Sequence, residues 1–406
     1  MKKITLAFIF ILFSFWVRTQ TTVSFYSADS FRLDGTLTVP QNVEQPPVLI
    51  LVHGSGQVNR DSEIRITGQP NFPCIYPNLV GQTSRFFKDI ADSLKAAGIA
   101  VLRYDKRTTR PADNDVENLT VYDFVRDVHA AVNFLRERDD VDTNNIFLLG
   151  HSQGSSVTAA LAAESIDICG VISAAGSSTR IDTLYADQVY RIQAECNDDS
   201  ATGAMQRIQV LAAMQQMSAG IVPDTVAVLG AYPPFWRSWM QISDSAIYNF
   251  QQAGLPLLVL QGDADFNVPV KEVEPYRTIN PAKTQVHILE GVNHLFNAGS
   301  TVKTESKTLE LIIGFILDNK KTTGIFDFEE SNSNFYRIYR ERNRVRVVNE
   351  TAAVMRVSWF DFSGRHLGSA SSESYGEAVF DLHRPLTLVN VQCGDKSKSL
   401  KLNAVR

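Results

Sequence analysis

The sequence predicts an α/β protein, built on a doubly wound, mostly parallel sheet with a helical cap and followed by a small all-β domain. Strand-like and helix-like runs alternate from residue 48 to 174, which is typical of parallel βαβ units. Between about 179 and 250 the alternation stops and the chain becomes helical. Residues 344–406 hold only short strand-like runs separated by Gly, Ser and Asp.

Composition excludes several classes of protein. The chain has 406 residues, of which 44% are hydrophobic, so it can bury more than one core. Its net charge is −5, and no basic stripe with interleaved aromatic residues occurs. We therefore expect no nucleic-acid partner.

The first 20 residues have the pattern of a secretory signal peptide. Lys2 and Lys3 precede an apolar run over 4–17. This run is shorter than the roughly 20 apolar residues that a spanning helix needs. We expect residues 1–20 to be removed on export, and the mature protein to be secreted or held at the cell surface without a stable membrane span.

The first elements of the predicted sheet are a hairpin and a buried strand. Residues 22–27 and 31–39 alternate apolar and polar side chains and form the antiparallel edge. Val48–Val52 is a continuous apolar run that leads into the tight loop His53-Gly54-Ser55-Gly56.

The remaining elements complete the doubly wound pattern. Further strands are expected at 99–103, 145–149, 168–174, 255–261 and 284–290, and helices at 86–97, 120–138, 153–164 and 304–318. The domains follow as 21–320 for the catalytic domain with its cap at about 179–250, 321–343 for a linker, and 344–406 for a β-sandwich-like domain.

A candidate nucleophile lies between a strand and a helix, in Gly150-His151-Ser152-Gln153-Gly154. A G-x-S-x-G segment in this context forms a strained turn that projects the serine Oγ above the sheet. Gly150 and Gly154 are small because neighbouring chain passes close by. Ser152 is therefore the predicted nucleophile.

A serine hydroxyl needs a base to take its proton, and in this arrangement the histidine follows the acid along the chain. His294 comes in a loop just after the strand at 284–290, at the strand end where ligands bind in such sheets. His287 lies inside that strand. We therefore assign His294 as the base.

The acid should come from the loop after the strand at 255–261, which contains Asp263 and Asp265. Asp265, the third residue after Gly262, is our assignment. Asp263 could instead hydrogen-bond its own turn, as Asp often does.

The oxyanion of an acyl-transfer intermediate requires preorganised N–H donors. We expect these from the backbone of Gln153 and from Ser55 in the His53-Gly54-Ser55-Gly56 loop.

Four cysteines are too few to form a disulfide framework for a chain of this length. We expect Cys169 to be a small buried residue. Cys74 and Cys196 both fall in loop or cap regions and could pair, although sequence alone does not fix pairings.

At these residues the chain resembles the α/β-hydrolase superfamily over residues 21–320. More narrowly it resembles secreted bacterial acyl esterases, through His53-Gly54-Ser55-Gly56, Arg60-Asp61 and Arg103-Tyr104-Asp105-Lys106-Arg107. That group continues with a glycine-rich turn, where this chain has Thr108-Thr109-Arg110-Pro111. The resemblance implies hydrolysis of small-molecule carboxylic esters or thioesters, without a metal or a cofactor.

The C-terminal segment is similar to the sorting domain that directs Bacteroidetes proteins through the type IX secretion system. The similarity rests on its strand-rich length, on Asp361-Phe362-Ser363-Gly364-Arg365 and on Lys398-Ser399-Leu400-Lys401-Leu402. The G-x-Y that usually precedes the penultimate strand is replaced by Arg384-Pro385-Leu386-Thr387. The resemblance implies the secretion machinery as a partner, against the alternative of a generic accessory domain.

Two other functions remain open. An aminopeptidase of the same fold would need acidic side chains in the cap to bind a free α-amine. Candidates for that role are Glu195, Asp198, Asp199 and Asp224. A surface protein using the fold only as a binding scaffold is the third reading, which the complete Ser, Asp and His set disfavours.

Overall fold

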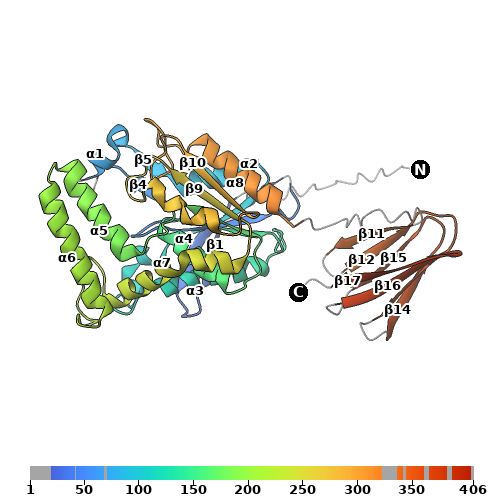
Figure 1. The fold of residues 1–406 in the computed structure, drawn as a ribbon. Coiled ribbons are helices and arrows are strands. Elements are labelled where there is room, and N and C mark those ends of the chain that lie inside the picture. Colours follow the sequence, from blue (N-terminus) through green and yellow to red (C-terminus); the bar gives the residue numbers. More distant parts are fainter. Residues whose placement is uncertain are drawn as a thin grey trace, which may run out of the picture. The chain divides into compact units, whose positions relative to one another are not determined.

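A computed structural model describes residues 20–41, 43–67, 71–321, 336–341, 344–360, 365–381 and 386–403. The chain divides into two compact units, Met1–Lys320 and Lys321–Arg406 (Figure 1). The expected signal peptide, apart from Gln20, lies outside the described residues. So do residues 322–335, 342 and 343 of the predicted linker, the segment 361–364 and the segment 382–385. The linker is shorter than predicted, because residues 336–341 form a strand of the second unit.

The first unit is built on one eight-stranded sheet, with the order β1-β2-β6-β3-β7-β8-β9-β10. Its strands are β1 (Gln20–Tyr26), β2 (Arg32–Thr38), β3 (Val48–Val52), β6 (Ala100–Tyr104), β7 (Ile146–His151), β8 (Gly170–Ala174), β9 (Leu257–Gly262) and β10 (Thr284–Leu289). Only the β1–β2 and β2–β6 pairs are antiparallel. The predicted doubly wound, mostly parallel sheet with an antiparallel edge is confirmed.

The chain order reverses at β3, because β6 pairs with one side of it and β7 with the other. Ligands bind open α/β sheets at such a reversal, beyond the carboxyl ends of the strands. The loops that leave β3 and β7 carry Ser55 and Ser152, so the topology brings these two serines to one place.

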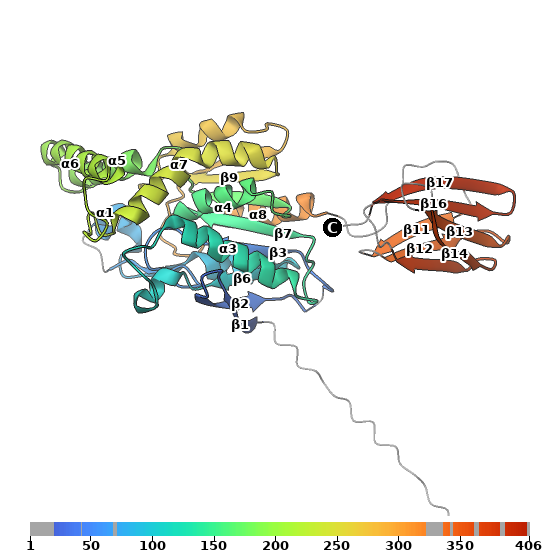
Figure 2. The same ribbon diagram turned by 90° about the horizontal axis from the view of Figure 1, so that it is seen from below.

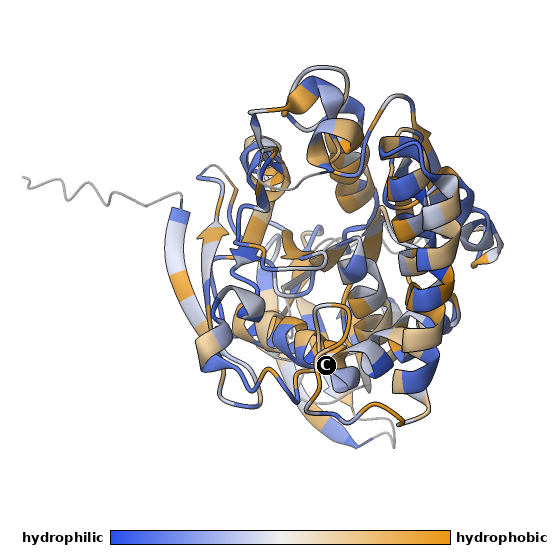
Figure 3. Ribbon diagram, turned by 90° about the vertical axis from the view of Figure 1, so that its left-hand side faces the viewer, coloured by the Kyte–Doolittle hydropathy of each residue, from blue (hydrophilic) through white to orange (hydrophobic). Residues whose placement is uncertain are grey.

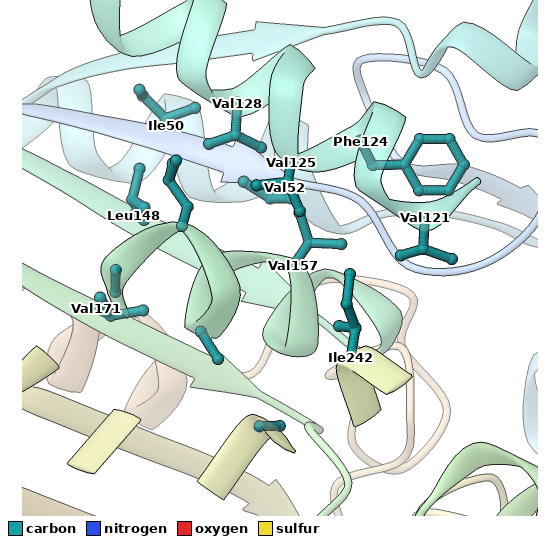
Figure 4. Packing of buried hydrophobic residues seen from close by; sticks show 14 of the residues in the cluster. Ile50, Val52, Val121, Phe124, Val125, Val128, Leu148, Val157, Val171 and Ile242 are labelled. Carbon is teal, nitrogen blue, oxygen red and sulfur yellow. The ribbon is translucent and has the colours of Figure 1, made fainter. Parts of the chain in front are cut away.

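Two layers of helices cover the sheet. α2 (Phe86–Ala96) and α8 (Ser306–Asn319) form one layer, and α3 (Val121–Arg136), α4 (Gln153–Ala163) and α7 (Pro233–Ala253) form the other. The continuous apolar run of β3 serves both layers: Leu49 and Leu51 face the first, while Ile50 and Val52 face the second. Figure 4 shows the second set packed with Val157 of α4.

The cap differs in extent from the expected 179–250. α5 (Ile181–Arg191) continues through a π turn at Ile192–Cys196 and is followed by the antiparallel helix α6 (Ser200–Ser218). Helix α7, in contrast, packs on α4, with Ile242 close to Val157 (Figures 2 and 4). The sequence pattern marks α7 as amphipathic but does not tell which surface its apolar face meets.

The cap hairpin is fastened to the rest of its unit by a disulfide. Cys196 at the end of the π turn bonds Cys74, which lies in α1 (Phe72–Ile75) between β3 and α2. The pairing that the sequence left open is thus present. Cys169 is a free, buried thiol, as expected.

Figure 3 views the molecule from the side on which α5 and α6 lie in Figure 1. The cap helices carry a mixture of hydrophilic and hydrophobic residues, as expected for helices with one buried face.

The second unit is all β. One sheet has the order β11-β12-β15 and the other β14-β13-β16-β17. Their strands are β11 (Tyr336–Glu341), β12 (Arg344–Asn349), β13 (Met355–Phe360), β14 (His366–Ser372), β15 (Glu377–Asp381), β16 (Leu386–Cys393) and β17 (Lys396–Asn403). Val347 and Phe380 of the first sheet share a core with Val357 and Val391 of the second, so the small all-β part is confirmed.

Neither unit contains, among its described residues, a helix that is long and apolar enough to cross a membrane.

Candidate active site

Ser152 occupies the turn between β7 and α4. Its backbone has φ 54° and ψ −120°, a conformation that costs a non-glycine residue about 1–3 kcal/mol. The turn is nevertheless held, because the Ser152 N–H donates to the carbonyl of Ala174 in the neighbouring strand, at 2.8 Å. The serine side chain lines a pocket above the sheet.

The two glycines of the turn are required by close backbone contacts. A Cβ on Gly150 would lie 2.2 Å from the carbonyl oxygen of Gly154. A Cβ on Gly154 would lie 2.3 Å from the carbonyl oxygen of Val52. Both distances are far inside van der Waals contact, so α4 can start this close to β3 only with glycine at these positions.

His294 and Asp265 form a buried pair. His294 Nδ1 lies 2.8 Å from Asp265 Oδ2, and their side chains are 8% and 0% exposed. The other carboxylate oxygen accepts the backbone N–H groups of Asn267 and Val268, at 2.8 and 2.9 Å. Because Asp265 accepts the hydrogen bond from Nδ1–H, the other ring nitrogen, Nε2, carries no hydrogen. In this tautomer the histidine can take a proton at Nε2.

The two loops that carry this pair cross in close contact. A Cβ on Gly262 would lie 1.9 Å from the carbonyl oxygen of Val292. Ala264 N–H donates to the same carbonyl, at 3.1 Å. The glycine thus lets the loop after β9 approach the loop after β10 and brings Asp265 to His294.

The alternative residues lie elsewhere. Asp263 accepts the N–H of Gly291 at 2.6 Å, so it holds the turn after β10. His287 is a residue of β10 itself. Of the two aspartates and two histidines weighed from sequence, the structure pairs only Asp265 with His294.

His151, which the sequence analysis left without a role, supports the histidine loop. Its Nε2 lies 2.9 Å from the carbonyl oxygen of His294 and donates to it. Burial lowers the pKa of His151 to about 3, so the ring is neutral. Its position beside the nucleophile in the G-x-S-x-G segment was the available signal.

The two residues expected to stabilise an oxyanion lie in the same pocket as Ser152. Ser55 and Gln153 both line it. Gln153 is the first residue of α4, so its N–H has no acceptor inside the helix. A Cβ on Gly54 would lie 3.2 Å from the Cβ of Ser152, which shows how closely the loop after β3 passes the serine.

Ion pairs between the two charged motifs fix that loop. Arg60 Nη2 lies 2.5 Å from Asp105 Oδ2, and its Nε also bonds this carboxylate. In the second pair the charges are exchanged, because Arg103 of β6 bonds Asp61 of the loop. The loop after β3 is therefore clamped to the end of β6 at two adjacent residues.

The segment that replaces the glycine-rich turn forms two short 3-10 turns, Arg107–Thr109 and Pro111–Asp113. No residue of this segment has a positive φ, so its geometry does not call for glycine. Thr108 adds a contact of its own, because its hydroxyl donates to the carbonyl of Gly56 at 2.8 Å.

The pocket at Ser152 has a volume of about 210 Å³. Its apolar wall comes mainly from α5 and α7, through Ile181, Leu184, Tyr185, Trp236 and Trp239, and is completed by Ala175, Leu229 and Val268. Hydroxyl groups of Ser156, Ser177, Thr179 and Ser243 also line it. None of the described residues that line the pocket carries a charge.

The site offers no ready metal centre. Within the described ranges, no three or more His, Cys, Asp or Glu side chains are grouped so that they could hold an ion.

The sequence matches one protein family and one curated relative. The family described as "Serine aminopeptidase, S33" matches residues 80–297. Esterase EstD of Thermotoga maritima is 29% identical over 276 residues, covering 67% of this chain but only 60% of the relative's own length.

Two solved structures are similar to the chain. Est1E from Butyrivibrio proteoclasticus is 17% identical, with 73% of this chain and 98% of that chain covered and a TM-score of 0.47. An esterase of Pyrococcus furiosus is 14% identical, with 74% and 92% covered and a TM-score of 0.44. Because the family match spans more than half of the 406 residues, this chain belongs to the serine aminopeptidase S33 family of the α/β-hydrolase superfamily.

Proposed function

We propose that the chain is a serine esterase that hydrolyses small carboxylic esters or thioesters. The observation that carries the proposal is the buried His294–Asp265 pair together with the strained Ser152 at the start of α4. Ser152 lines a pocket whose described residues carry no charge. The relative from Thermotoga maritima, which bears the name esterase, supports the same reaction.

The reaction proceeds in two halves. Ser152 Oγ attacks the ester carbonyl while His294 Nε2 takes the hydroxyl proton, and Asp265 stabilises the resulting imidazolium. The negative charge on the carbonyl oxygen is met by the N–H groups of Gln153 and Ser55. Collapse of the intermediate breaks the C–O bond, and His294 returns its proton to the leaving alcohol.

The acyl-enzyme then reacts with water. His294 takes a proton from the water as its oxygen adds to the acyl carbon, and the carboxylic acid leaves as the proton returns to Ser152 Oγ. No other reactant enters this cycle.

The pocket disfavours the aminopeptidase alternative, because a free α-ammonium needs a carboxylate nearby. None of the four acidic residues considered for that role lines the pocket. Asp224 pairs with Arg237, and Asp199 accepts the N–H of Thr202 at the start of α6. Glu195 lines a separate groove and Asp198 is exposed.

Pocket size sets the expected substrate. An apolar cavity of about 150 Å³ holds benzene, so 210 Å³ takes a group only slightly larger. We expect hydrolysis to be fastest with p-nitrophenyl butanoate or hexanoate and to fall steeply at dodecanoate.

The test is hydrolysis of p-nitrophenyl esters of graded acyl length, in parallel with aminoacyl p-nitroanilides, by the wild type and Ser152→Ala. Ester turnover that depends on Ser152 is the expected result. Turnover of the anilides alone would replace the esterase by the peptidase, and equal ester turnover by Ser152→Ala would overturn the mechanism.

We also propose that the protein is exported to an oxidising compartment and lies outside the cytoplasm. The Cys74–Cys196 disulfide supports this, because disulfides persist mainly in such compartments. The leader at 1–20 points the same way. The full chain expressed in a bacterial host should lose its leader and resist thiol alkylation at both cysteines; an uncleaved, fully alkylated cytoplasmic protein would contradict export.

For the C-terminal unit we propose a sorting role in type IX secretion. Its two small antiparallel sheets and separate core support a domain that folds by itself. Residues 321–406 fused behind a reporter with a signal peptide should carry it to the surface of a bacterium that has this system. Retention of the reporter in the periplasm, as with the reporter alone, would contradict the role.

A further inference from the structure

Lys106 is a buried lysine whose ammonium group lies beside the proposed oxyanion hole. It is 4% exposed, and its Nζ donates to the carbonyl oxygen of Gly54 at 2.6 Å and to Gln153 Oε1 at 2.8 Å. The ring of Phe124 lies below the ammonium, with its centroid at 4.2 Å. Gly54 lies in the loop after β3, and Gln153 follows Ser152 at the start of α4. The Lys106 side chain therefore connects these two segments.

The contact with Gly54 sets the direction of the Ser55 donor. The Gly54 carbonyl and the Ser55 N–H belong to one peptide group, and in a trans peptide these two bonds point in opposite directions. A cation fixed on the carbonyl therefore holds the N–H pointing the other way. It also polarises the peptide, which strengthens the N–H as a donor.

The contact with Gln153 acts on the second donor residue. Its amide oxygen is bonded to Lys106, while its amide nitrogen is buried without a hydrogen-bond partner in the described chain. Because Gln153 lines the Ser152 pocket, this amide can donate to the oxyanion that forms on the substrate during the reaction.

Thr108 completes the hold on the loop. Its hydroxyl bonds the Gly56 carbonyl, so the carbonyls on both sides of Ser55 are held from the segment after β6. That segment is anchored by Arg107, which bonds Asp127 of α3 at 2.5 Å and Asp29 at 2.7 Å.

The charge on Lys106 is not cancelled by a contacting carboxylate. Among described residues, its ammonium bonds only the two carbonyl-type oxygens named above. The charged or titratable groups that face it are Asp127 of α3, itself paired with Arg107, and His53, which directly follows β3. Burial lowers the pKa of Lys106 to about 7.

We propose that Lys106 is the positioning residue of the oxyanion hole: it orients the Ser55 and Gln153 donors and adds a positive charge behind them. This inference rests on the proposed esterase function. It assigns Lys106 no contact with the substrate, so its loss should lower kcat and leave KM nearly unchanged.

The test compares Lys106→Met, Lys106→Arg and Thr108→Val with Lys88→Met, a control that removes an exposed lysine on α2. With p-nitrophenyl butanoate, Lys106→Met should lower kcat about 10- to 100-fold, short of the 10²–10³-fold loss of a whole donor. Thr108→Val should lower it about threefold, and Lys88→Met should match the wild type. Lys106→Arg should recover a large part of the loss, because it keeps the charge.

The pH profile separates positioning by charge from a packing role. Wild-type kcat should fall above about pH 7 as Lys106 loses its proton. In Lys106→Arg this fall should move to higher pH, since arginine keeps its charge. Circular dichroism shows whether Lys106→Met folds. If it does not, the pH dependence of kcat in Lys106→Arg and the kcat of Thr108→Val still test the positioning role.

The two proposals fail in distinguishable ways. A folded Lys106→Met with kcat within threefold of the wild type, or identical alkaline limbs for wild type and Lys106→Arg, would overturn the role of Lys106 while the esterase function stands. A wild type that cleaves no ester and does not react with a fluorophosphonate would remove the proposed function, and this inference with it.

Discussion

The two sides of Ser152 are built by different means. On the side of His294, the carboxylate of Asp265 is held by backbone N–H groups of its own loop, and the two loops lock through Gly262. On the side of Ser55, the loop is held from the end of β6 by long charged side chains, Lys106 among them. Proton-transfer residues can thus be recognised by type, whereas backbone donors are placed by side chains that never touch the substrate.

Removing the proton-transfer pair should have the largest effect on activity. His294→Gln should lower kcat by about 10⁶-fold and Asp265→Asn by about 10⁴-fold, because the base is lost in one and its tautomer is wrong in the other. Steady-state kinetics with p-nitrophenyl butanoate measure both. The matched variants His287→Gln and Asp263→Asn should stay within about fivefold of the wild type; if Asp263→Asn were the more damaging aspartate variant, the assignment of Asp265 would be wrong.

The glycines of the serine turn serve both sides, and Gly154→Ala should damage them together. The new Cβ would lie 2.3 Å from the Val52 carbonyl oxygen, so we expect a loss of more than ~3 kcal/mol in the free energy of unfolding and loss of activity. Urea unfolding measures it.

The control for Gly154→Ala is Gly314→Ala in α8. A Cβ there meets nothing within 4 Å, and alanine favours a helix by about 1 kcal/mol, so this variant should be slightly more stable than the wild type. A Gly154→Ala protein as stable as the wild type would show that the close approach of α4 to β3 is wrong.

Acid should weaken both sides through one buried histidine on each. His53 donates to the Tyr104 carbonyl beside the Ser55 loop, and His151 donates to the His294 carbonyl. Burial lowers the pKa of His53 to about 4 and that of His151 to about 3. Between pH 6.5 and about 4 the unfolded chain binds protons at these histidines and the native chain does not, so stability falls as pH falls.

At pH 5 we expect a loss of about 2 kcal/mol for each of these histidines relative to pH 7. Urea unfolding at the two pH values measures the sum, and His53→Gln should show a smaller pH dependence than the wild type. A free energy of unfolding that is flat over this range would mean that these rings are not buried in their neutral form.

The smallest effect is expected from the clamp between the charged motifs. Arg60→Met removes the bonds to Asp105, but both side chains are about one quarter exposed, so the loss should be about 1 kcal/mol with a roughly fivefold lower kcat. Arg85→Met, which breaks a more exposed pair with Glu63, should change neither quantity measurably. Equal kcat in Arg60→Met and the wild type would show that the Ser55 loop keeps its place without the clamp.

The sequence predicted the sheet well because its central strands are short apolar runs bounded by turn residues, and its edge hairpin alternates apolar and polar residues. Val48–Val52, for example, agrees with β3 to the residue. The helix α7 was assigned to the cap instead of the layer that covers the sheet, because an amphipathic pattern marks an apolar face without naming its partner. The sequence also left the Cys74–Cys196 pairing undecided, because the two segments are far apart along the chain and meet only in the folded structure.

For the site, sequence sufficed where residue type and chain order decide. Ser152, Asp265 and His294 could be chosen because few residue types can act as nucleophile, acid and base. Lys106 was noticed only as part of a motif. Its burial depends on Phe124 of α3 and Gln153 of α4, and nothing in a lysine's own neighbourhood along the chain predicts that it will be enclosed.

The most direct test of the central claim is the reaction of the protein with a fluorophosphonate, followed by peptide mass spectrometry. We predict one adduct, on Ser152, which is absent from Ser152→Ala and forms far more slowly in His294→Gln. Failure to form an adduct, or an adduct on another serine that persists in Ser152→Ala, would contradict the assignment of Ser152 as an activated nucleophile.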